Sequence, residues 1–440
     1  MKKKLKKTIR SLLMPGKLLS IAAALCIVFS CAGNKHAYKN ELNILMPGNL
    51  QKNPAQIRIL SSFKKKYPDI NVIISSVPWN ARSERLLTSI ASGNAPDLCF
   101  LTGTEIKNWL RQEIFLDLNP FINNDPAFQE KIKEIYPQKL IQAGSLNKSV
   151  FALPIWQNIT VTIYNRELFD REGLSYPGPG WEWENYTQAA RKMLKDDNND
   201  GVIDQYGTIL MKTWMAMLIL PEQAGYPLID PVEQKSLIDR PETAKIFDKY
   251  YSLYLKEKIV PVPGSGNVET SGQTSAEMFM TKKIGVLFAG HNEIAEFNNS
   301  PDLSWGIAPM LKIGKLRKTL NNMILAAVIK KGRNNENGVK FIKHMLSDIS
   351  QKALPIAADM PVIKSAMYSD DFLNRHTSRQ NKNIFIEALP DSIIWPDRLT
   401  SEIFHSIGKH IELAIAGSIT FTQACAAAAK EVNDLLNERK

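Results

Sequence analysis

Five segments between residues 42 and 101 decide the fold: LNIL (42–45), NPAQIRILSSF (53–63), INVIISSV (70–77), RLLTSIASG (85–93) and DLCFL (97–101). The second and fourth segments carry apolar residues at helical spacing, and Asn53-Pro54 is a typical helix start. The other three are short apolar runs, and the β-branched run 70–77 predicts a buried strand. Strands that alternate with helices predict an α/β domain with a mainly parallel sheet, whose ligands bind outside the carboxyl ends of the strands.

The first 30 residues have the features of an export signal. Six Lys and Arg residues precede position 11, and an apolar run follows from Leu18 to Phe29. This run is shorter than the roughly 20 residues that a membrane-spanning helix needs. We therefore predict a signal peptide over residues 1–30 and an exported protein, with Met1 and Met14 as alternative start positions.

The signal ends in Val28-Phe29-Ser30-Cys31, which resembles the bacterial lipobox. In that motif the Cys thiol takes a diacylglycerol and becomes the new N-terminus. Phe29 departs from the small or medium residue usual at its position, so cleavage without a lipid is the alternative. Residues 31–41 are mostly small and polar, as a flexible tether requires. We predict lipidation of Cys31, a tether over residues 31–41, and a location that is lipid-anchored at the cell membrane or periplasmic.

Charge and length describe a soluble protein of two domains once the signal is removed. The net charge drops from +11 to +4, because residues 1–30 hold seven basic residues and no acid. A charge this small predicts no nucleic-acid partner. Roughly 400 mature residues exceed what one core usually holds. Cys99 and Cys425 lie in apolar segments, which predicts two buried thiols, and their spacing suits no metal site.

Several motifs follow one another in a familiar order. FKKKYPDINV (63–72), IASGNAPDL (90–98), FALP (151–154) and IYNRELF (163–169) resemble segments of extracellular solute-binding proteins for sugars. WENY (183–186), AEMFMTKKIGVLF (276–288), IAPM (307–310) and NGVKFIKHMLS (337–347) continue the likeness. Each match is weak alone, but the ordered set covers nearly the whole mature chain.

The resemblance implies an α/β, two-lobe fold of the periplasmic-binding-protein type II, with a hinge crossed more than once and the ligand in the cleft between the lobes. Mapped onto this sequence, it predicts residues 42–154 and 284–325 in one lobe and residues 160–282 and 332–440 in the other. It also implies a monomer that closes around a carbohydrate and delivers it to the permease subunits of an ABC importer.

Sugars offer apolar C–H faces and rings of hydroxyl groups, so aromatic and amide side chains are the candidates to bind them. The chain has eight tryptophans. By their position in the family and beside the predicted crossings, we expect ligand contacts from Trp79, Trp156, Gln157, Asn158, Trp214, His291, Asn292, Asn321, Asn322 and Trp395. His291-Asn292 stands where relatives often place an aromatic residue, which leaves the type of sugar open. Plain core packing is the alternative for each tryptophan.

The segment DDNNDGVID (196–204) begins like a calcium-binding loop, with oxygen donors at alternate positions and a glycine at the turn. Asp196, Asn198, Asp200 and Asp204 are the candidate ligands of a structural calcium ion. The bidentate Glu of an EF-hand is missing, because Gly207 stands at position twelve. A solvated Asx-type turn is therefore the alternative, and no other cofactor is expected.

Enzyme signatures are absent from the sequence: it has no G-x-S-x-G, P-loop, H-E-x-x-H or dinucleotide-binding glycine motif. We therefore predict a binding protein without catalytic activity. A sensory or scavenging protein for another small polar ligand, such as a polyamine or a phosphodiester, is the alternative to a transport receptor, because both functions use the same fold.

Overall fold

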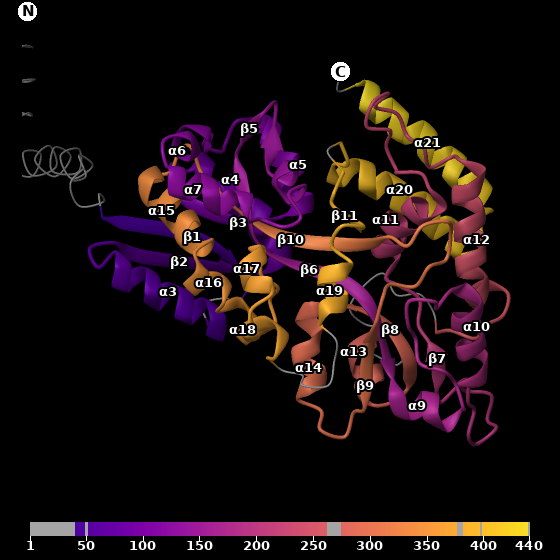
Figure 1. Ribbon diagram of the computed structural model, residues 1–440. Helices are drawn as coiled ribbons and strands as arrows, with labels where there is room; N and C mark the ends of the chain where they lie inside the picture. Colours follow the sequence, from indigo (N-terminus) through magenta and orange to yellow (C-terminus); the bar gives the residue numbers. More distant parts are fainter. Residues whose placement is uncertain (1–39, 49–51, 262–273, 376–381, 397, 439–440) are drawn as a thin grey trace, which may run out of the picture.

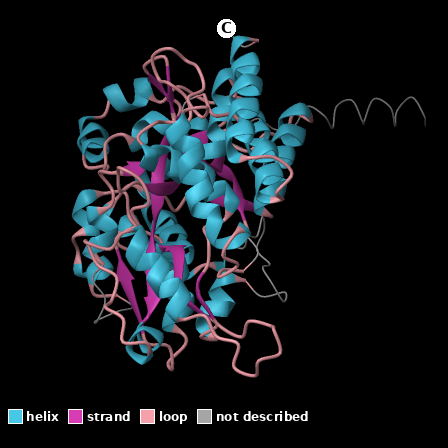
Figure 2. Ribbon diagram, turned by 90° about the vertical axis from the view of Figure 1, so that its right-hand side faces the viewer, coloured by secondary structure: helices cyan, strands magenta, loops and turns pink. Residues whose placement is uncertain are grey.

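The computed structural model describes residues 40–48, 52–261, 274–375, 382–396 and 398–438. Two α/β bodies stand side by side, and two long strands, β6 (Ala152–Asn165) and β10 (Thr319–Val328), run between them (Figure 1). Helices surround the strands of both bodies (Figure 2). We call the bodies the first and the second lobe. This arrangement confirms the predicted two-lobe α/β fold.

The first lobe is built around one apolar cluster that extends from Leu42 to Ala366. Its strands are β1 (Glu41–Pro47), β2 (Asn71–Val77), β3 (Leu98–Thr102) and the hairpin β4 (Ser145–Leu146) and β5 (Ser149–Val150). Its helices are α3 (Pro54–Lys66), η2 (Trp79–Ala81), α4 (Arg82–Ala91), α5 (Gly103–Trp109), η3 (Leu110–Gln112), α6 (Asn119–Asn123), α7 (Pro126–Lys133), α8 (Leu140–Ala143), α15 (Asn335–Met345), α16 (Asp348–Gln351), η6 (Leu354–Ala357) and α17 (Lys364–Met367).

The second lobe contains two apolar clusters. Its strands are β7 (Tyr206–Thr208), β8 (Ile284–Gly290), β9 (Trp305–Ala308) and β11 (Ser392–Ile393). Its helices are α9 (Arg166–Arg171), α10 (Trp183–Lys192), α11 (Thr213–Ala224), α12 (Pro241–Leu255), α13 (Ser275–Met280), η5 (His291–Glu293), α14 (Ile294–Asn298), α18 (Asp370–Leu373), α19 (Asn383–Glu387), α20 (Ser401–Ile415) and α21 (Phe421–Asn437).

The expected strand–helix order opens the first lobe. Asn53 caps α3 and accepts hydrogen bonds from the backbone N–H groups of Ala55 and Gln56, with Pro54 in the first turn. β1 pairs in parallel with β2 and with β3, as the alternation predicted. The predicted strand at 70–77 is present, but its predicted burial was wrong, because β2 is the edge strand and its residues alternate between half-buried and exposed.

The main sheet continues through both lobes in the order β2-β1-β3-β10-β6-β8-β7. β6 and β10 pair antiparallel from Ala152↔Ala327 to Ile159↔Asn321, with a register shift at Ile324 and Leu325. The first part of β6 packs in the first lobe and the rest packs in the second, and β10 makes the same crossing in reverse. A third crossing lies between residues 360 and 372, where Val362, Ile363 and Ala366 pack in the first-lobe cluster and Met360, Met367 and Phe372 pack in a second-lobe cluster.

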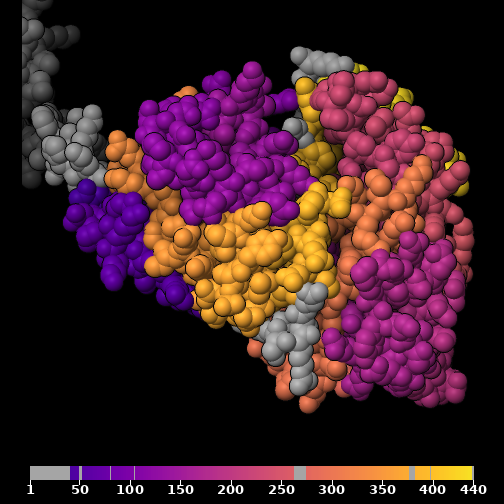
Figure 3. Space-filling view, in the orientation of Figure 1, coloured from indigo at the N-terminus to yellow at the C-terminus, as the bar shows by residue number. Residues whose placement is uncertain are grey.

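Two segments lie in the opposite lobe from the one predicted. β8 and β9 were expected in the first lobe, but both pair with the second-lobe half of β6. Residues 332–366 were expected in the second lobe, but Val339, Phe341 and Ile342 of α15 pack in the first-lobe cluster. In Figure 3 the orange residues of this segment lie directly against the purple residues of the first lobe. The chain order does not reveal these partners, because both contacts are long-range.

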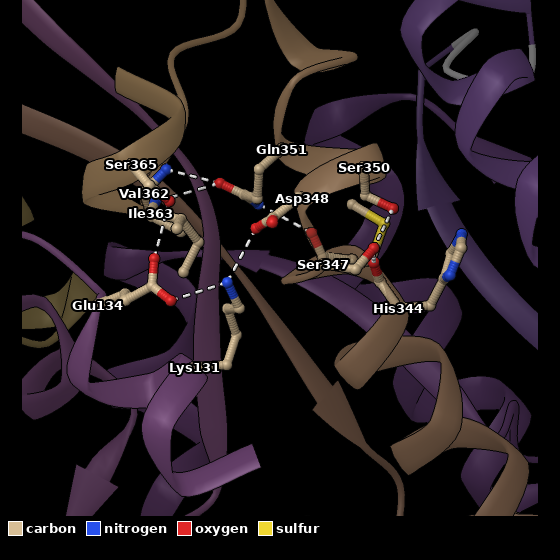
Figure 4. Close-up of polar contacts among 11 residues, drawn as sticks. Lys131, Glu134, His344, Ser347, Asp348, Ser350, Gln351, Val362, Ile363 and Ser365 are labelled. Carbon is tan, nitrogen blue, oxygen red and sulfur yellow. Dashed lines mark hydrogen bonds and ion pairs between the residues drawn. The ribbon is translucent and has the colours of Figure 1, made fainter. Parts of the chain in front are cut away.

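Gln351 fastens the segment 335–366 to the first lobe (Figure 4). Its side-chain nitrogen donates to the carbonyl oxygens of Ile155 and Met345, each at 2.8 Å. Its side-chain oxygen accepts from the N–H groups of Val362 and Ile363, at 2.8 and 3.3 Å. A side chain with no exposed surface thus satisfies four backbone groups, one of them in the crossing strand β6.

Both described cysteines, Cys99 and Cys425, are buried and free, as predicted, and they lie in the cores of different lobes. Burial raises the pKa of each thiol to about 12. Across the ranges that the structure describes, every helix is too short or too polar to span a lipid bilayer.

We expect Gln351→Leu to lower the free energy of unfolding by about 2–4 kcal/mol, because it leaves four buried backbone groups without partners. Ser365→Ala is the control, since this exposed hydroxyl only donates to Glu134, and it should change stability by less than about 0.5 kcal/mol. Urea denaturation of the mature protein measures both. Equal stability of the two variants would contradict the role of Gln351.

Candidate ligand-binding cleft

The carboxyl end of β3 forms the first-lobe wall of a cleft. Thr102 ends the strand and caps α5, accepting from the N–H of Glu105, whose carboxylate accepts in turn from the N–H and the hydroxyl of Thr102. Gly103 follows, and a Cβ there would lie 3.6 Å from Cβ of Trp395. The two lobes therefore come into close contact at this strand end.

Trp79 lies beyond the carboxyl end of β2 and is 46% exposed. The guanidinium of Arg82 stacks 4.6 Å from the centre of its ring and forms an ion pair with Glu105. Burial lowers the pKa of Arg82 to about 10. The same Glu105 carboxylate accepts hydrogen bonds from Thr102. Contacts through Arg82 and Glu105 therefore connect the exposed indole to the cleft wall at Thr102.

Three asparagines form the polar floor of the cleft where β6 and β10 cross. Every residue of both strands is described, and only Asn158 in β6 and Asn322 in β10 are not buried. These two residues are direct partners across the ladder. The amide of Asn158 also donates to the side-chain oxygen of Asn292 at 2.5 Å and accepts from the Asn292 N–H at 3.3 Å.

Aromatic residues form the second-lobe wall. Trp214 is in the first turn of α11, Trp395 is in the loop before α20, and Phe404 is on α20. Trp395 donates its indole N–H to the carbonyl of Leu399 at 2.5 Å and meets Phe404 edge-on, with ring centres 4.9 Å apart. The three rings enclose a pocket of about 250 Å³ together with Thr102, Gly103, Leu320, Asn321, Asn322 and Met323.

Two carboxyl groups near the crossing have raised pKa values. Burial raises the pKa of Glu293 to about 6, and the positive charge of Lys212 partly opposes this. Burial alone raises the pKa of Asp359 to about 7. Glu293 follows Asn292 directly, and the neighbour of Asp359, Met360, accepts from the Gln157 N–H in β6 at 2.9 Å. Both groups therefore carry less negative charge than ordinary surface carboxylates.

A family model described as bacterial extracellular solute-binding protein matches residues 49–352. The chain belongs to this family. Members are extracellular solute-binding proteins, so the family makes this chain an exported binding protein. A putative binding protein of Brucella abortus is 23% identical over 140 residues, which are 32% of this chain and 33% of that protein. The chain thus matches about a third of the length of such curated relatives.

Solved structures share the fold of this solute-binding protein over most of its length. An ABC substrate-binding protein of Listeria monocytogenes in complex with cycloalternan has a TM-score of 0.77 at 21% identity, covering 91% of this chain and 99% of that one. A solute-binding protein of Thermotoga lettingae bound with α-D-tagatose has a TM-score of 0.75 at 18% identity, covering 90% and 100%. A sugar-binding protein of Xanthomonas citri has 0.75 at 17%, covering 91% and 98%.

Of the ten predicted ligand-contacting residues, Trp214, Asn322 and Trp395 line the pocket, and Asn158 and Asn292 lie beside it through the pairing of Asn158 with Asn322. Trp79 is exposed but is not among the residues that line the pocket, so its contact with ligand stays a prediction. Asn321 borders the pocket, but its side-chain nitrogen donates to Gln157 at 2.7 Å.

Three predicted residues are buried away from ligand, which corrects their assignment. Trp156 packs edge-on against Phe100 in the first-lobe core. Gln157 has no exposed surface, and its nitrogen donates to the carbonyls of Tyr136 and Pro361.

His291 is the third buried residue. Its ring lies between Phe372 and Phe385, 5.0 Å from each ring centre, and its Nδ1 is 2.6 Å from the carbonyl oxygen of Ala358. Strand alternation explains Gln157, which is one step from Asn158 in β6 and points to the opposite face. His291 is in the 3-10 turn η5, and its burial follows from packing between the two phenylalanine rings.

The side chains of the loop 196–204 accept hydrogen bonds from the loop's own backbone. Asp196 accepts from the N–H groups of Asp200 and Gly201, and Asp204 accepts from that of Asp197. In the described part of the chain no three His, Cys, Asp or Glu side chains converge as metal ligands. Calcium binding here stays a prediction. Cys31, the signal peptide and most of the tether lie outside the described residues.

Sequence reasoning missed Thr102, Gly103 and Phe404. Thr102-Gly103 was recognisable, because it follows the predicted strand 97–101 at its carboxyl end. Phe404 carries no such signal, since only the fold of α20 turns it toward Trp395. Asp97, at the start of the predicted strand 97–101, has a structural role: its carboxylate accepts from the backbone N–H groups of Asn43 and Asn334.

A larger hollow of about 1400 Å³ is lined mainly by residues 110–121 and by the β4–β5 hairpin, with Gln234 and Arg398 from the second lobe. It opens widely to solvent and contains none of the asparagines of the crossing. We therefore place the candidate site at the aromatic cleft.

We expect Gly290→Ala to destabilise the protein by about 1–3 kcal/mol, because the added Cβ would overlap the side-chain amide of Asn158. In an Asn158→Ala background, Gly290→Ala should lower the free energy of unfolding clearly less, because the amide that the new Cβ would overlap is absent. Urea denaturation of the four proteins gives the coupling energy. Equal costs in both backgrounds would show that Gly290 does not position Asn158.

Proposed function

We propose that this protein is the substrate-binding component of an ABC importer and captures a carbohydrate in the cleft between its lobes. The observation that carries the proposal is the pairing of three aromatic rings, Trp214, Trp395 and Phe404, with the amides of the crossing strands. Rings pack on the apolar C–H faces of a sugar, and amides both donate to and accept from its hydroxyl groups.

The relatives support this proposal. Two of the proteins that share the fold are described in complexes with cycloalternan and with α-D-tagatose, and both are transporter binding proteins by their descriptions. Asn158, Asn292 and Asn322 add no formal charge, and the positive charge of Lys212 lies close enough to Glu293 to lower the pKa of its carboxyl against the effect of burial. A site of this kind favours a neutral polyol over a cationic polyamine or an anionic phosphodiester.

The site favours binding and delivery over catalysis. Opening and closing of the lobes about the three crossings would hold the ligand and then release it to the permease. Lipidation of Cys31 would keep the protein beside its transporter, and a monomer suffices for this role because both walls of the cleft come from one chain.

We expect one sugar of a panel of neutral and acidic mono- and oligosaccharides to change the tryptophan fluorescence of the purified mature protein. Trp214→Ala should weaken binding of that sugar by roughly 1–3 kcal/mol, or about five- to 150-fold in Kd. Tyr176→Ala is the matched control, because this exposed ring packs near Tyr164 and Phe169 in the second lobe. A folded protein whose fluorescence changes with none of these sugars would contradict the carbohydrate proposal.

Export with a lipid anchor has a separate test. We expect the full-length protein, expressed in a bacterial host, to incorporate a labelled fatty acid and to sediment with membranes. Cys31→Ser should abolish both, because only the thiol can take the diacylglycerol, whereas Cys99→Ser should retain the label. A labelled Cys31→Ser protein would place the anchor elsewhere.

A further inference from the structure

A second pocket of about 270 Å³ lies in a groove between α11 and α20 of the second lobe. Thr213, Trp214 and Met217 line it from α11, and Ser401, Phe404, His405, Gly408 and Glu412 line it from α20. The α20 residues recur three or four positions apart, so they share one face of the helix. The groove is thus a continuous feature of two packed helices.

The glycine at 408 keeps the groove open. A Cβ at this position would lie 3.7 Å from Cε and 3.8 Å from Sδ of Met217, which is ordinary van der Waals contact. Alanine therefore fits here, but any longer side chain would extend into the space above Met217. α20 has no other glycine.

Trp214 and Phe404 line both this groove and the cleft pocket. The two pockets are therefore neighbours that share these two rings. Each alone is smaller than the roughly 300–1,000 Å³ of typical small-molecule sites, whereas together they fall within that range. This size argues that cleft and groove are two compartments of one site.

The groove offers polar groups suited to hydroxyls at its rim. His405 and Glu412 are exposed, and neither side chain hydrogen-bonds another residue in the ranges that the structure describes. At one end the N–H of Ser401 donates to the side-chain oxygen of Asn108 at 3.1 Å, and the Asn108 amide donates to the Ser401 hydroxyl at 2.7 Å. This contact joins α5 of the first lobe to α20 and bounds the groove there.

We propose that the ligand is an oligosaccharide of at least two units, with one unit in the cleft and the next in the groove, and that its linkage passes over Trp214 and Phe404. His405 and Glu412 bind the hydroxyl groups of the second unit and so select for chain length. This inference rests on the carbohydrate function proposed above and adds the size of the ligand to it.

The test compares homologous sugars by isothermal titration calorimetry of the mature protein. Two series serve as probes: glucose, maltose and maltotriose, and mannose, mannobiose and mannotriose. We expect the disaccharide of the series that binds to have at least about tenfold higher affinity than its monosaccharide. Gly408→Leu should remove most of that gain by filling the groove, and His405→Ala with Glu412→Gln should reduce it by several-fold.

Glu402→Gln is the matched control, since this exposed carboxyl is on α20 but outside both pockets. It should leave every affinity unchanged, and circular dichroism melting checks that each variant folds. Equal affinity for mono-, di- and trisaccharide, or an equal loss for all three in Gly408→Leu, would overturn the inference while leaving the carbohydrate function intact. The inference is also overturned if the protein binds no sugar of either series and the sugar of the wider panel that it does bind is a monosaccharide. A protein silent to all sugars overturns both proposals.

Discussion

The pairing of β6 with β10 is the constraint on which the rest of the structure depends. Each strand passes through both lobes, so one antiparallel ladder fixes the position of the first lobe against the second. The residues around the crossing must be buried on both faces, which requires near-continuous apolar sequence. Both strands also contain polar residues, but these are buried, whereas Asn158 and Asn322 are the residues of the two strands that are not buried, and they stand at paired positions. Polar groups in otherwise buried strands are costly without partners, so their placement at the one accessible point of the ladder is best explained by a ligand.

The walls of the cleft follow from the direction of the strands. β1, β2 and β3 run in parallel, and their carboxyl ends deliver Trp79 and Thr102 to the same side of the first lobe. In the second lobe β7 and β8 are also parallel, and the segments that follow them begin α11 with Trp214 and η5 with Asn292. Two parallel units face each other across the crossing strands, and the helical C-terminal segment adds Trp395 and Phe404. The site is therefore assembled from residues that lie far apart in the sequence.

Local chemistry made much of the first lobe predictable. Three features depend only on neighbours in sequence, and the structure has each of them: the helix cap at Asn53, the glycine that follows the helix at Gly93, and the strand at 97–101.

The lobe to which each segment belongs was not predictable in this way. α15 is placed by Gln351 and by packing on β1 and α3, contacts that span hundreds of residues. The site predictions failed for different reasons: Gln157 is next to Asn158 in β6 and faces the opposite side, whereas His291 is in the turn η5 and is buried by packing. The crossing predicted after residue 154 is present in β6, but the one predicted between residues 282 and 284 is not, because β8 pairs within the second lobe. The register of the ladder, which the sequence does not show, decides which side chains of β6 and β10 reach the cleft.

Burial of carboxyl groups gives the crossing an electrostatic character that sequence composition hides. Moving a carboxylate out of water raises its pKa unless a cation compensates. Lys212 compensates Glu293 only in part, so its pKa stays near 6, and Asp359 reaches about 7 by burial alone. Burial thus makes the carboxyl of Asp359 keep its proton to a higher pH than an exposed carboxyl does, and a protonated carboxyl can donate a hydrogen bond as well as accept one. Hydroxyl groups need both kinds of partner. Buried carboxyl groups beside the asparagine amides thus suit a neutral, hydroxyl-rich ligand. They disfavour a cationic ligand, because a cation that leaves water needs fully ionised carboxylates to offset the loss of its hydration.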